Sequence, residues 1–186
     1  MNRLDILSYL NELKLNGIGV EVGVQQGYFS KVILDGWKCK LFYLVDIWQP
    51  QSSETYNDIA NVATEVQISN LKDTIHQLSS HWNRIRIIQL LSSEASRLFD
   101  LESLDFVYLD ANHSYEGCKK DLELWYPKIK TGGVIAGHDY PSWPGVKQAV
   151  DEFFKDKLFE VDQDSFIYIK KRLISDFQLT WKKIFI

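Results

Sequence analysis

The chain lacks several features that mark particular classes of protein. It has only two cysteines among 186 residues, too few for a disulfide framework and without metal-type spacing. No apolar run approaches the roughly 18 residues needed to span a bilayer, and the N-terminus does not follow the pattern of a signal peptide. These absences predict a cytoplasmic protein with reduced cysteines and no membrane partner.

An excess of positive charge is also missing. The sequence carries 21 Lys and Arg against 25 Asp and Glu, which gives a formal net charge of −4. Proteins that follow nucleic-acid phosphates need the opposite balance, so we expect no nucleic-acid partner. At this length we expect one domain over residues 1–186, with an N-terminal helix in 1–16 and a C-terminal tail at 172–186.

The glycines near the N-terminus fall at positions 19, 23 and 27, so the Gly-x-Gly-x-x-Gly spacing of a dinucleotide site is absent. An apolar, β-prone run instead contains Glu21 and leads into Gly23 and Gly27, and a helical pattern follows. Glycine lets the backbone approach a ligand closely, and the free N–H groups of a helix N-terminus point at it. This strand–turn–helix predicts a nucleotide-like ligand, and its spacing disfavours a nicotinamide dehydrogenase.

Strand-like runs alternate with helical periodicities along most of the chain. The longest helix is expected at about 59–80, and the clearest one begins after Ser114, with an apolar stripe that reaches Ile129. Strands are expected at 18–23, 41–46, 84–90, 104–110 and 134–137, followed by a hairpin of 158–161 and 166–169. The predicted fold is α/β and Rossmann-like: a seven-stranded, mostly parallel sheet with an antiparallel C-terminal edge hairpin and helices on both faces.

Three carboxylates stand at or near the ends of expected strands. They are Glu21, Asp46 and Asp110, on the first, second and fourth strands. Ligands bind outside the carboxyl ends of parallel strands, where such side chains face the crevice. An acid after the second strand can accept hydrogen bonds from ribose hydroxyls, and acids suit an ammonium and a sulfonium better than a pyrophosphate. The three residues therefore predict an S-adenosylmethionine site; the alternative is that they only keep loops soluble.

Two motifs in the second half of the chain carry a family resemblance. Asp110-Ala-Asn-His-Ser-Tyr-Glu116 and Gly132-Gly-(x)4-His-Asp-Tyr140 resemble the class I S-adenosylmethionine-dependent methyltransferases, in the subgroup of macrocin-type and cephalosporin-hydroxylase-like O-methyltransferases. The resemblance spans about residues 17–155 and implies the class I methyltransferase sandwich and a small-molecule acceptor. It implies cofactor contacts from Glu21, Gly23, Gly27 and Asp46, with Ser92 or Ser93 near the adenine.

A metal and a general base are also expected at this edge of the sheet. Asp110, His138 and Asp139 converge if the fourth and fifth strands are neighbours, and such ligands suit Mg or Mn. His138 would otherwise only form hydrogen bonds at a strand end. His113 is the candidate catalytic base, because the ordinary histidine pKa of about 6.5 suits proton removal near neutrality. The resemblance also places a catalytic histidine there; a capping role is the alternative.

Two other functions stay open from the sequence. A metal-dependent hydrolase could use Asp110, His113, His138 and Asp139, although Glu21, Gly23 and Asp46 would then have no role. A cofactor-binding domain without turnover, acting as a partner-binding module, is the second. The apolar residues of the C-terminal tail are compatible with a homo-oligomer; they are Trp181, Ile184, Phe185 and Ile186.

Overall fold

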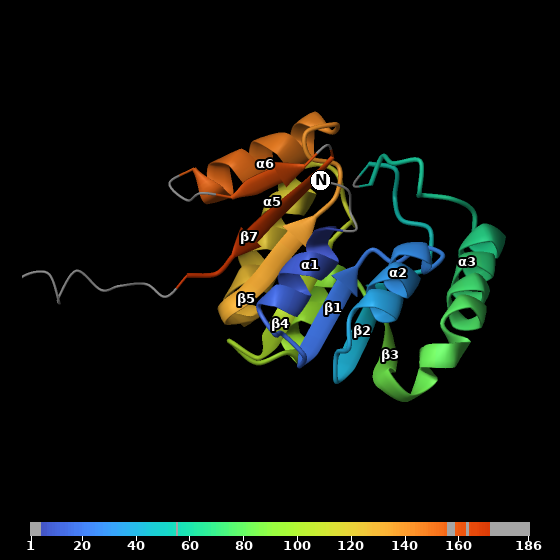
Figure 1. Cartoon of the computed structure of the whole chain (residues 1–186). Helices are drawn as coiled ribbons and strands as arrows, with labels where there is room; N and C mark the ends of the chain where they lie inside the picture. Colours follow the sequence, from blue (N-terminus) through green and yellow to red (C-terminus); the bar gives the residue numbers. More distant parts are fainter. Residues whose placement is uncertain (1–4, 55, 156–158, 163, 172–186) are drawn as a thin grey trace, which may run out of the picture.

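The computed structural model describes residues 5–54, 56–155, 159–162 and 164–171. At its centre is one sheet of seven strands in the order β3-β2-β1-β4-β5-β7-β6, with helices on both faces (Figure 1). The strands are β1 (Ile18–Val22), β2 (Leu41–Asp46), β3 (Ile85–Gln89), β4 (Leu104–Leu109), β5 (Ile129–Gly137), β6 (Glu160–Asp162) and β7 (Ser165–Ile169). The first five pair in parallel, and β7 pairs antiparallel to β5 and β6. This architecture confirms the α/β, Rossmann-like fold.

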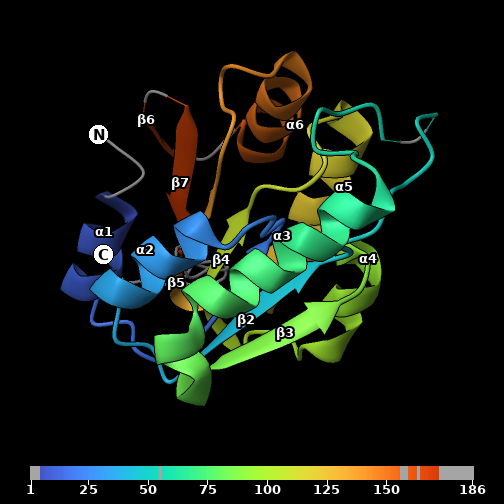
Figure 2. The same ribbon diagram turned by 90° about the vertical axis from the view of Figure 1, so that its right-hand side faces the viewer.

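Six α-helices flank the sheet in two layers. They are α1 (Asp5–Glu12), α2 (Tyr28–Gly36), α3 (Thr64–Gln77), α4 (Ser92–Ala95), α5 (Tyr115–Trp125) and α6 (Pro144–Phe154). Buried residues of α4, α5 and α6 pack on one face of the sheet, and those of α1 and α2 pack on the other. Figure 2 shows α3 crossing in front of β2 and β3.

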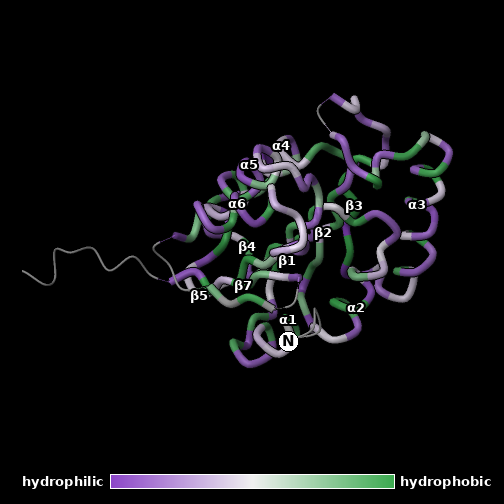
Figure 3. The backbone as a smooth tube through the Cα atoms, turned by 90° about the horizontal axis from the view of Figure 1, so that it is seen from above, coloured by the Kyte–Doolittle hydropathy of each residue, from purple (hydrophilic) through white to green (hydrophobic). Residues whose placement is uncertain are grey.

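The apolar pattern of the strands explains this arrangement. Alternate residues of a strand face opposite sides, and in β4 Val107 belongs to the core beneath α5 while Phe106 and Tyr108 belong to the core beneath α2. All six residues of β4 are buried, as expected for a central parallel strand covered on both faces. The apolar segments accordingly lie along the strands (Figure 3).

Several element bounds differ from those expected. The long helix begins at Thr64 rather than near 59, because Asp58 and Asn61 form a hydrogen-bonded turn before it: Asp58 Oδ1 accepts from the Ala60 N–H, and the Asn61 amide donates to the Gln51 carbonyl. Ile129, expected on a helical stripe, opens β5, because α5 ends at Trp125 and a 3-10 turn containing Pro127 follows.

At the C-terminus, β6 runs over Glu160–Asp162, whereas the expected strand began at 158. Residue 158 and the tail at 172–186 lie outside the described residues. Cys39 and Cys118 are both buried, and they form no disulfide with each other. Within the described ranges, none of the helices combines the length and the apolar character that a bilayer crossing requires.

Asp105, near the amino end of β4, contacts both neighbouring strands. Asp105 Oδ2 accepts the backbone N–H of Ile18, at the start of β1, at 2.9 Å, and its Oδ1 lies 2.9 Å from Lys130 Nζ of β5. One side chain therefore joins the amino ends of three neighbouring strands. The predicted ligand site lies at the carboxyl ends of the strands.

Candidate active site

The turn after β1 depends on glycine. Gly23 has φ +88°, and a Cβ built on it would lie 1.9 Å from the carbonyl oxygen of Asp110, the residue that follows the neighbouring strand β4. No side chain fits there. Gly27, with φ +76°, is the N-cap residue of α2 and also adopts a left-handed conformation that glycine tolerates without strain. The two glycines bring the turn close to Asp110 and start the helix.

Asp46, at the end of β2, holds this turn in place. Its Oδ2 accepts the backbone N–H groups of Val24 and Gln25, each at 2.9 Å, and its Oδ1 accepts that of Trp48 at 2.9 Å. Gln25 and Trp48 both have positive φ, at 52° and 42°. A carboxylate offers about four lone-pair positions, so these contacts leave about one for a ligand. Asp46 thus shapes the turn as well as facing the site.

Glu21 lies beneath the turn. It is 1% exposed, and the hydroxyl of Ser30 in α2 donates a hydrogen bond to its Oε2. The Ser30 side chain is itself fully buried. A buried carboxylate needs such partners, because an unpaired charge in an apolar surrounding is costly. Glu21 is thereby fixed at the base of the site.

These residues border one cavity of about 540 Å³, a size within the range of small-molecule sites. All the predicted site residues line it except Gly27, whose position is that of a helix cap. The lining predicted residues are Glu21, Gly23, Asp46, Ser93, Asp110, His113, His138 and Asp139. The carboxyl ends of the first, second and fourth strands therefore open onto the same cavity.

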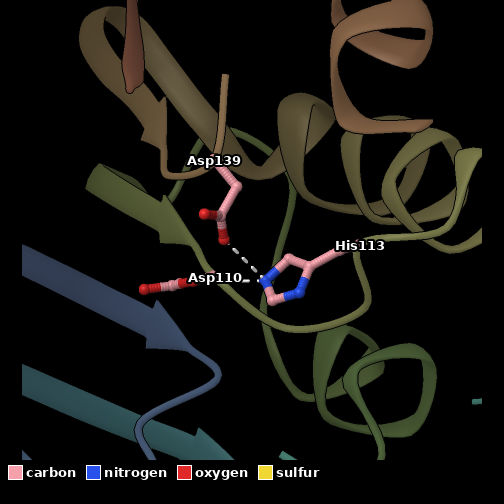
Figure 4. Close-up of side chains that lie close together, drawn as sticks. All are labelled: Asp110, His113 and Asp139. Atoms are coloured by element: carbon pink, nitrogen blue, oxygen red, sulfur yellow. Dashed lines mark hydrogen bonds and ion pairs between the residues drawn. The ribbon is translucent and has the colours of Figure 1, made fainter. Parts of the chain in front are cut away.

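One end of the cavity contains a cluster of two carboxylates and an imidazole. Asp110 follows β4, His113 precedes α5, and Asp139, with φ 62°, follows β5; Figure 4 shows the three side chains pointing toward one another. His113 Nε2 lies 2.9 Å from Asp139 Oδ2 and 3.5 Å from Asp110 Oδ1. One potential ligand atom from each residue lies within 4.8 Å of the others. The geometry therefore suits a divalent cation.

The other nitrogen of the same ring contacts a third acid. His113 Nδ1 lies 2.6 Å from Oδ2 of Asp58, whose side chain is only 3% exposed. Asp58 belongs to the loop between β2 and α3, in a polar stretch without periodicity, and nothing in the sequence singled it out. Tyr56 of the same loop donates its hydroxyl to the Ala111 carbonyl at 3.2 Å. This loop is thus joined to the cluster by two polar contacts.

His138 lies beside the cluster. Its Nδ1 is 3.2 Å from Asp139 Oδ1 and 3.8 Å from Asp110 Oδ1, while its Nε2 contacts Asp164 at 2.9 Å. The structure thus brings Asp110 and Asp139 together, as the sequence predicted, and the imidazole placed most closely between them is that of His113. His138 as a metal ligand stays a prediction.

The three acids change the protonation of His113. Burial favours the neutral ring, but hydrogen bonds to Asp110, Asp139 and Asp58 outweigh it and raise the pKa of His113 to about 10. Burial likewise tends to raise the pKa of Asp139, and its contacts with the imidazoles of His113 and His138 lower it well below the ordinary value. Without another cation in the cluster, the His113 ring is protonated at neutral pH.

The cavity is also lined by another buried acid, Asp121 of α5. Ser92, the first residue of α4, donates its hydroxyl to Asp121 Oδ1 at 2.5 Å and accepts the indole N–H of Trp125 at 2.9 Å. Asp121 occupies a position on the apolar stripe of its helix, between Cys118 and Leu122. An acid on an apolar stripe is a signal in the sequence for a buried polar role, and the residue also belongs to the segment that carries the family resemblance.

A family model described as a methyltransferase domain matches residues 20–140, more than half of the chain. Curated protein sequences give no match.

Solved structures share the fold. The O-methyltransferase NovP aligns over 92% of this chain and 78% of its own, with a TM-score of 0.66 and 19% identity. An O-methyltransferase from Bacillus cereus in complex with S-adenosylhomocysteine aligns over 89% and 78%, with a TM-score of 0.61 and 14% identity. CalS11, a TDP-rhamnose 3'-O-methyltransferase of calicheamicin biosynthesis, aligns over 92% and 79%, with a TM-score of 0.58 and 17% identity. At these identities the likeness establishes the fold.

Proposed function

The chain belongs to the methyltransferase domain family and is an S-adenosylmethionine-dependent methyltransferase; we propose that its acceptor is a hydroxyl group of a small molecule and that a divalent cation assists. The observation that carries the proposal is a single cavity with two chemically different ends. The glycine turn with Glu21 and Asp46 borders one region, and the cluster of Asp110, His113 and Asp139 borders another.

The first region suits the cofactor. The backbone of the turn approaches the cavity without a Cβ at Gly23, and Glu21 supplies a buried carboxylate for a positively charged group. S-adenosylmethionine carries an ammonium and a sulfonium, so acids favour it over a pyrophosphate-containing dinucleotide. We assign Glu21, Gly23, Asp46, Ser93 and Asp110 to its contacts, and Gly27 to the start of the helix behind them.

The second region suits a divalent cation such as Mg or Mn. Metal-binding histidines almost always donate the N–H of the ring nitrogen that faces away from the metal to a carboxylate, a backbone carbonyl or water. His113 has this arrangement: Nδ1 contacts Asp58, and Nε2 faces Asp110 and Asp139. A carboxylate-rich set is also the donor chemistry that Mg and Mn prefer. We therefore propose Asp110 and Asp139 as ligands, with His113 as the third and His138 next to them.

The proposed reaction is an in-line displacement at the cofactor's methyl group, which the sulfonium already activates. The protein must orient the acceptor hydroxyl, exclude water and remove a proton. A divalent cation bound at the cluster would lower the pKa of that hydroxyl. Its positive charge would also replace the charge that a protonated imidazole otherwise supplies to the acids. Because Asp58 engages Nδ1, Nε2 of His113 can bind the cation or take a proton, but not both. We propose that where Asp110 and Asp139 hold the cation without His113, the ring loses its own proton at neutral pH and its Nε2 takes the hydroxyl proton.

The alternatives account for fewer observations. A metal-dependent hydrolase would use the cluster but leave the glycine turn and Glu21 without a function, and the family match argues against it. A non-catalytic cofactor domain would keep the turn but leave the arrangement around His113 unexplained.

The test is ligand-dependent stability. S-adenosylhomocysteine at 100 times its dissociation constant should stabilise the fold by about 2.7 kcal/mol and raise the melting temperature, whereas NAD should not. Asp46→Ala should abolish the shift, while Asp73→Ala, an exposed acid on α3, should keep it. Stabilisation by NAD and not by S-adenosylhomocysteine would refute the proposed cofactor.

A further inference from the structure

We propose that Asp121 selects the adenine base of the cofactor by accepting a hydrogen bond from its exocyclic amino group. This inference rests on the proposed S-adenosylmethionine site and adds a specificity-determining residue that neither the motifs nor the metal cluster include. It starts from a buried carboxylate with a vacant acceptor position in the cavity wall.

Asp121 has one side-chain hydrogen-bond donor among the described residues. The residue is 7% exposed and lines the cavity. Ser92 donates to its Oδ1, and in the part of the chain that the structure describes no second hydrogen-bond donor reaches the carboxylate. Lys120 contributes only a longer-range electrostatic attraction. A donor from a ligand in the cavity can therefore supply a second hydrogen bond to this carboxylate.

The surroundings identify what kind of donor fits. Leu90, Leu91 and Ile47 line the same cavity as Ser92 and Asp121, so the cavity offers apolar surface as well as this acceptor. A flat heterocycle with an amino group on its edge matches both features, because its faces pack on aliphatic side chains and its N–H2 needs an acceptor. Among the parts of S-adenosylmethionine, only the adenine has this character.

The charge state is consistent with an acceptor role. Burial raises the pKa of Asp121 to about 6, against the opposing effect of the Ser92 hydrogen bond. The side chain is therefore ionised above neutral pH and offers lone pairs rather than a proton to the ligand. The position of Ser92 is fixed by Trp125, which leaves the Asp121 carboxylate held by a rigid partner.

The experiment compares S-adenosylhomocysteine with S-inosylhomocysteine, which has a carbonyl oxygen where adenine has its amino group. Isothermal titration calorimetry of the wild-type protein should give about 10- to 100-fold tighter binding of the adenosyl ligand, the ratio expected for a hydrogen bond to a charged group. In Asp121→Asn, the amide oxygen keeps the Ser92 contact and its N–H2 faces the ligand. The preference should then fall below about threefold or reverse.

Glu123→Gln is the matched control, an exposed acid on the same helix, and it should keep the wild-type ratio. A wild-type protein that binds both ligands equally, or an Asp121→Asn variant that keeps the full preference, overturns the inference while leaving the cofactor assignment intact. Asp121 would then contact a water in the small cavity that it also lines beside Cys118. Binding of neither ligand to the wild-type protein overturns the proposed function and this inference together. Equal binding of the two ligands by the wild-type protein overturns the inference whether or not the variant folds.

Discussion

Asp58 and His113 are 55 positions apart in the chain, and their side chains meet at 2.6 Å, with Asp58 almost fully buried. The contact joins the loop before α3 to the segment before α5, and it fixes which nitrogen of His113 faces Asp110 and Asp139. A residue outside every recognisable motif thereby sets the orientation of the candidate base. This contact leads to the first prediction.

Replacing Asp58 by Asn should lower the pKa of His113, because one of the three acids that raise it loses its charge. It should also weaken Mn binding by about 10- to 100-fold, the usual effect of removing the carboxylate behind a metal-binding histidine. NMR titration of the ring in protein treated with chelator measures the pKa, and calorimetry measures the affinity. Asp73→Asn serves as the control, and an unchanged pKa in Asp58→Asn would contradict the contact.

The stability of the metal-free protein should depend on pH through His113. Its pKa is about 10 in the folded state, against about 6.5 in an unfolded chain, so the folded protein holds the proton more tightly. The stabilisation is complete below about pH 6.5 and is lost as the pH rises through about 10, with at most about 4 kcal/mol lost between pH 6.5 and 9.5.

Urea denaturation with chelator present, at several pH values, measures this loss as the difference between wild type and His113→Asn, which removes the effect of other groups that titrate in the same range. A difference that does not change with pH would refute the raised pKa.

The choice between the two histidines is testable by metal titration. His113→Gln should weaken Mn binding by at least about 10-fold, and Asp110→Asn or Asp139→Asn should abolish it, because these residues form the most compact donor set. His138→Gln should change the affinity by less than about threefold, since its Nδ1 lies 3.8 Å from Asp110 and 3.2 Å from Asp139, farther from both acids than His113 Nε2 does. An equal loss in both histidine variants would make His138 a ligand as well, as the motif spacing first indicated.

Gly23, in the turn after β1, and Gly132, in β5, allow a matched comparison of two glycines with positive φ. Both have positive φ, near 88° and 84°, so alanine at either position should cost about 1–2 kcal/mol of backbone strain. At Gly132 a Cβ meets nothing within 4 Å, whereas at Gly23 it meets the Asp110 backbone. Gly23→Ala should therefore lose about 3 kcal/mol or more and all binding of S-adenosylhomocysteine. Gly132→Ala should bind normally in calorimetry; equal behaviour of the two variants would count against the close approach.

The sequence predicted the sheet and the cofactor turn well, because both depend on local patterns. Apolar runs define the parallel strands, and the glycine spacing disfavours the dinucleotide turn. The contacts of Asp58 and the acceptor role of Asp46 toward Val24 and Gln25 depend on loops that meet only after folding. Periodicity carries no information about such loops, and it also placed the start of α3 too early, since a hydrogen-bonded turn resembles the helix that it precedes.

The strand β4 has an acid at its start and another directly after its end. Asp105 links the beginnings of β1, β4 and β5, whereas Asp110 faces the cavity. Two positions only five residues apart in the chain therefore differ in role: substitution of Asp105 should lower stability, and substitution of Asp110 should lower activity. Variants at these two positions give a reference for every other variant. One shows the effect of a destabilised fold, and the other shows the effect of lost activity in a folded protein.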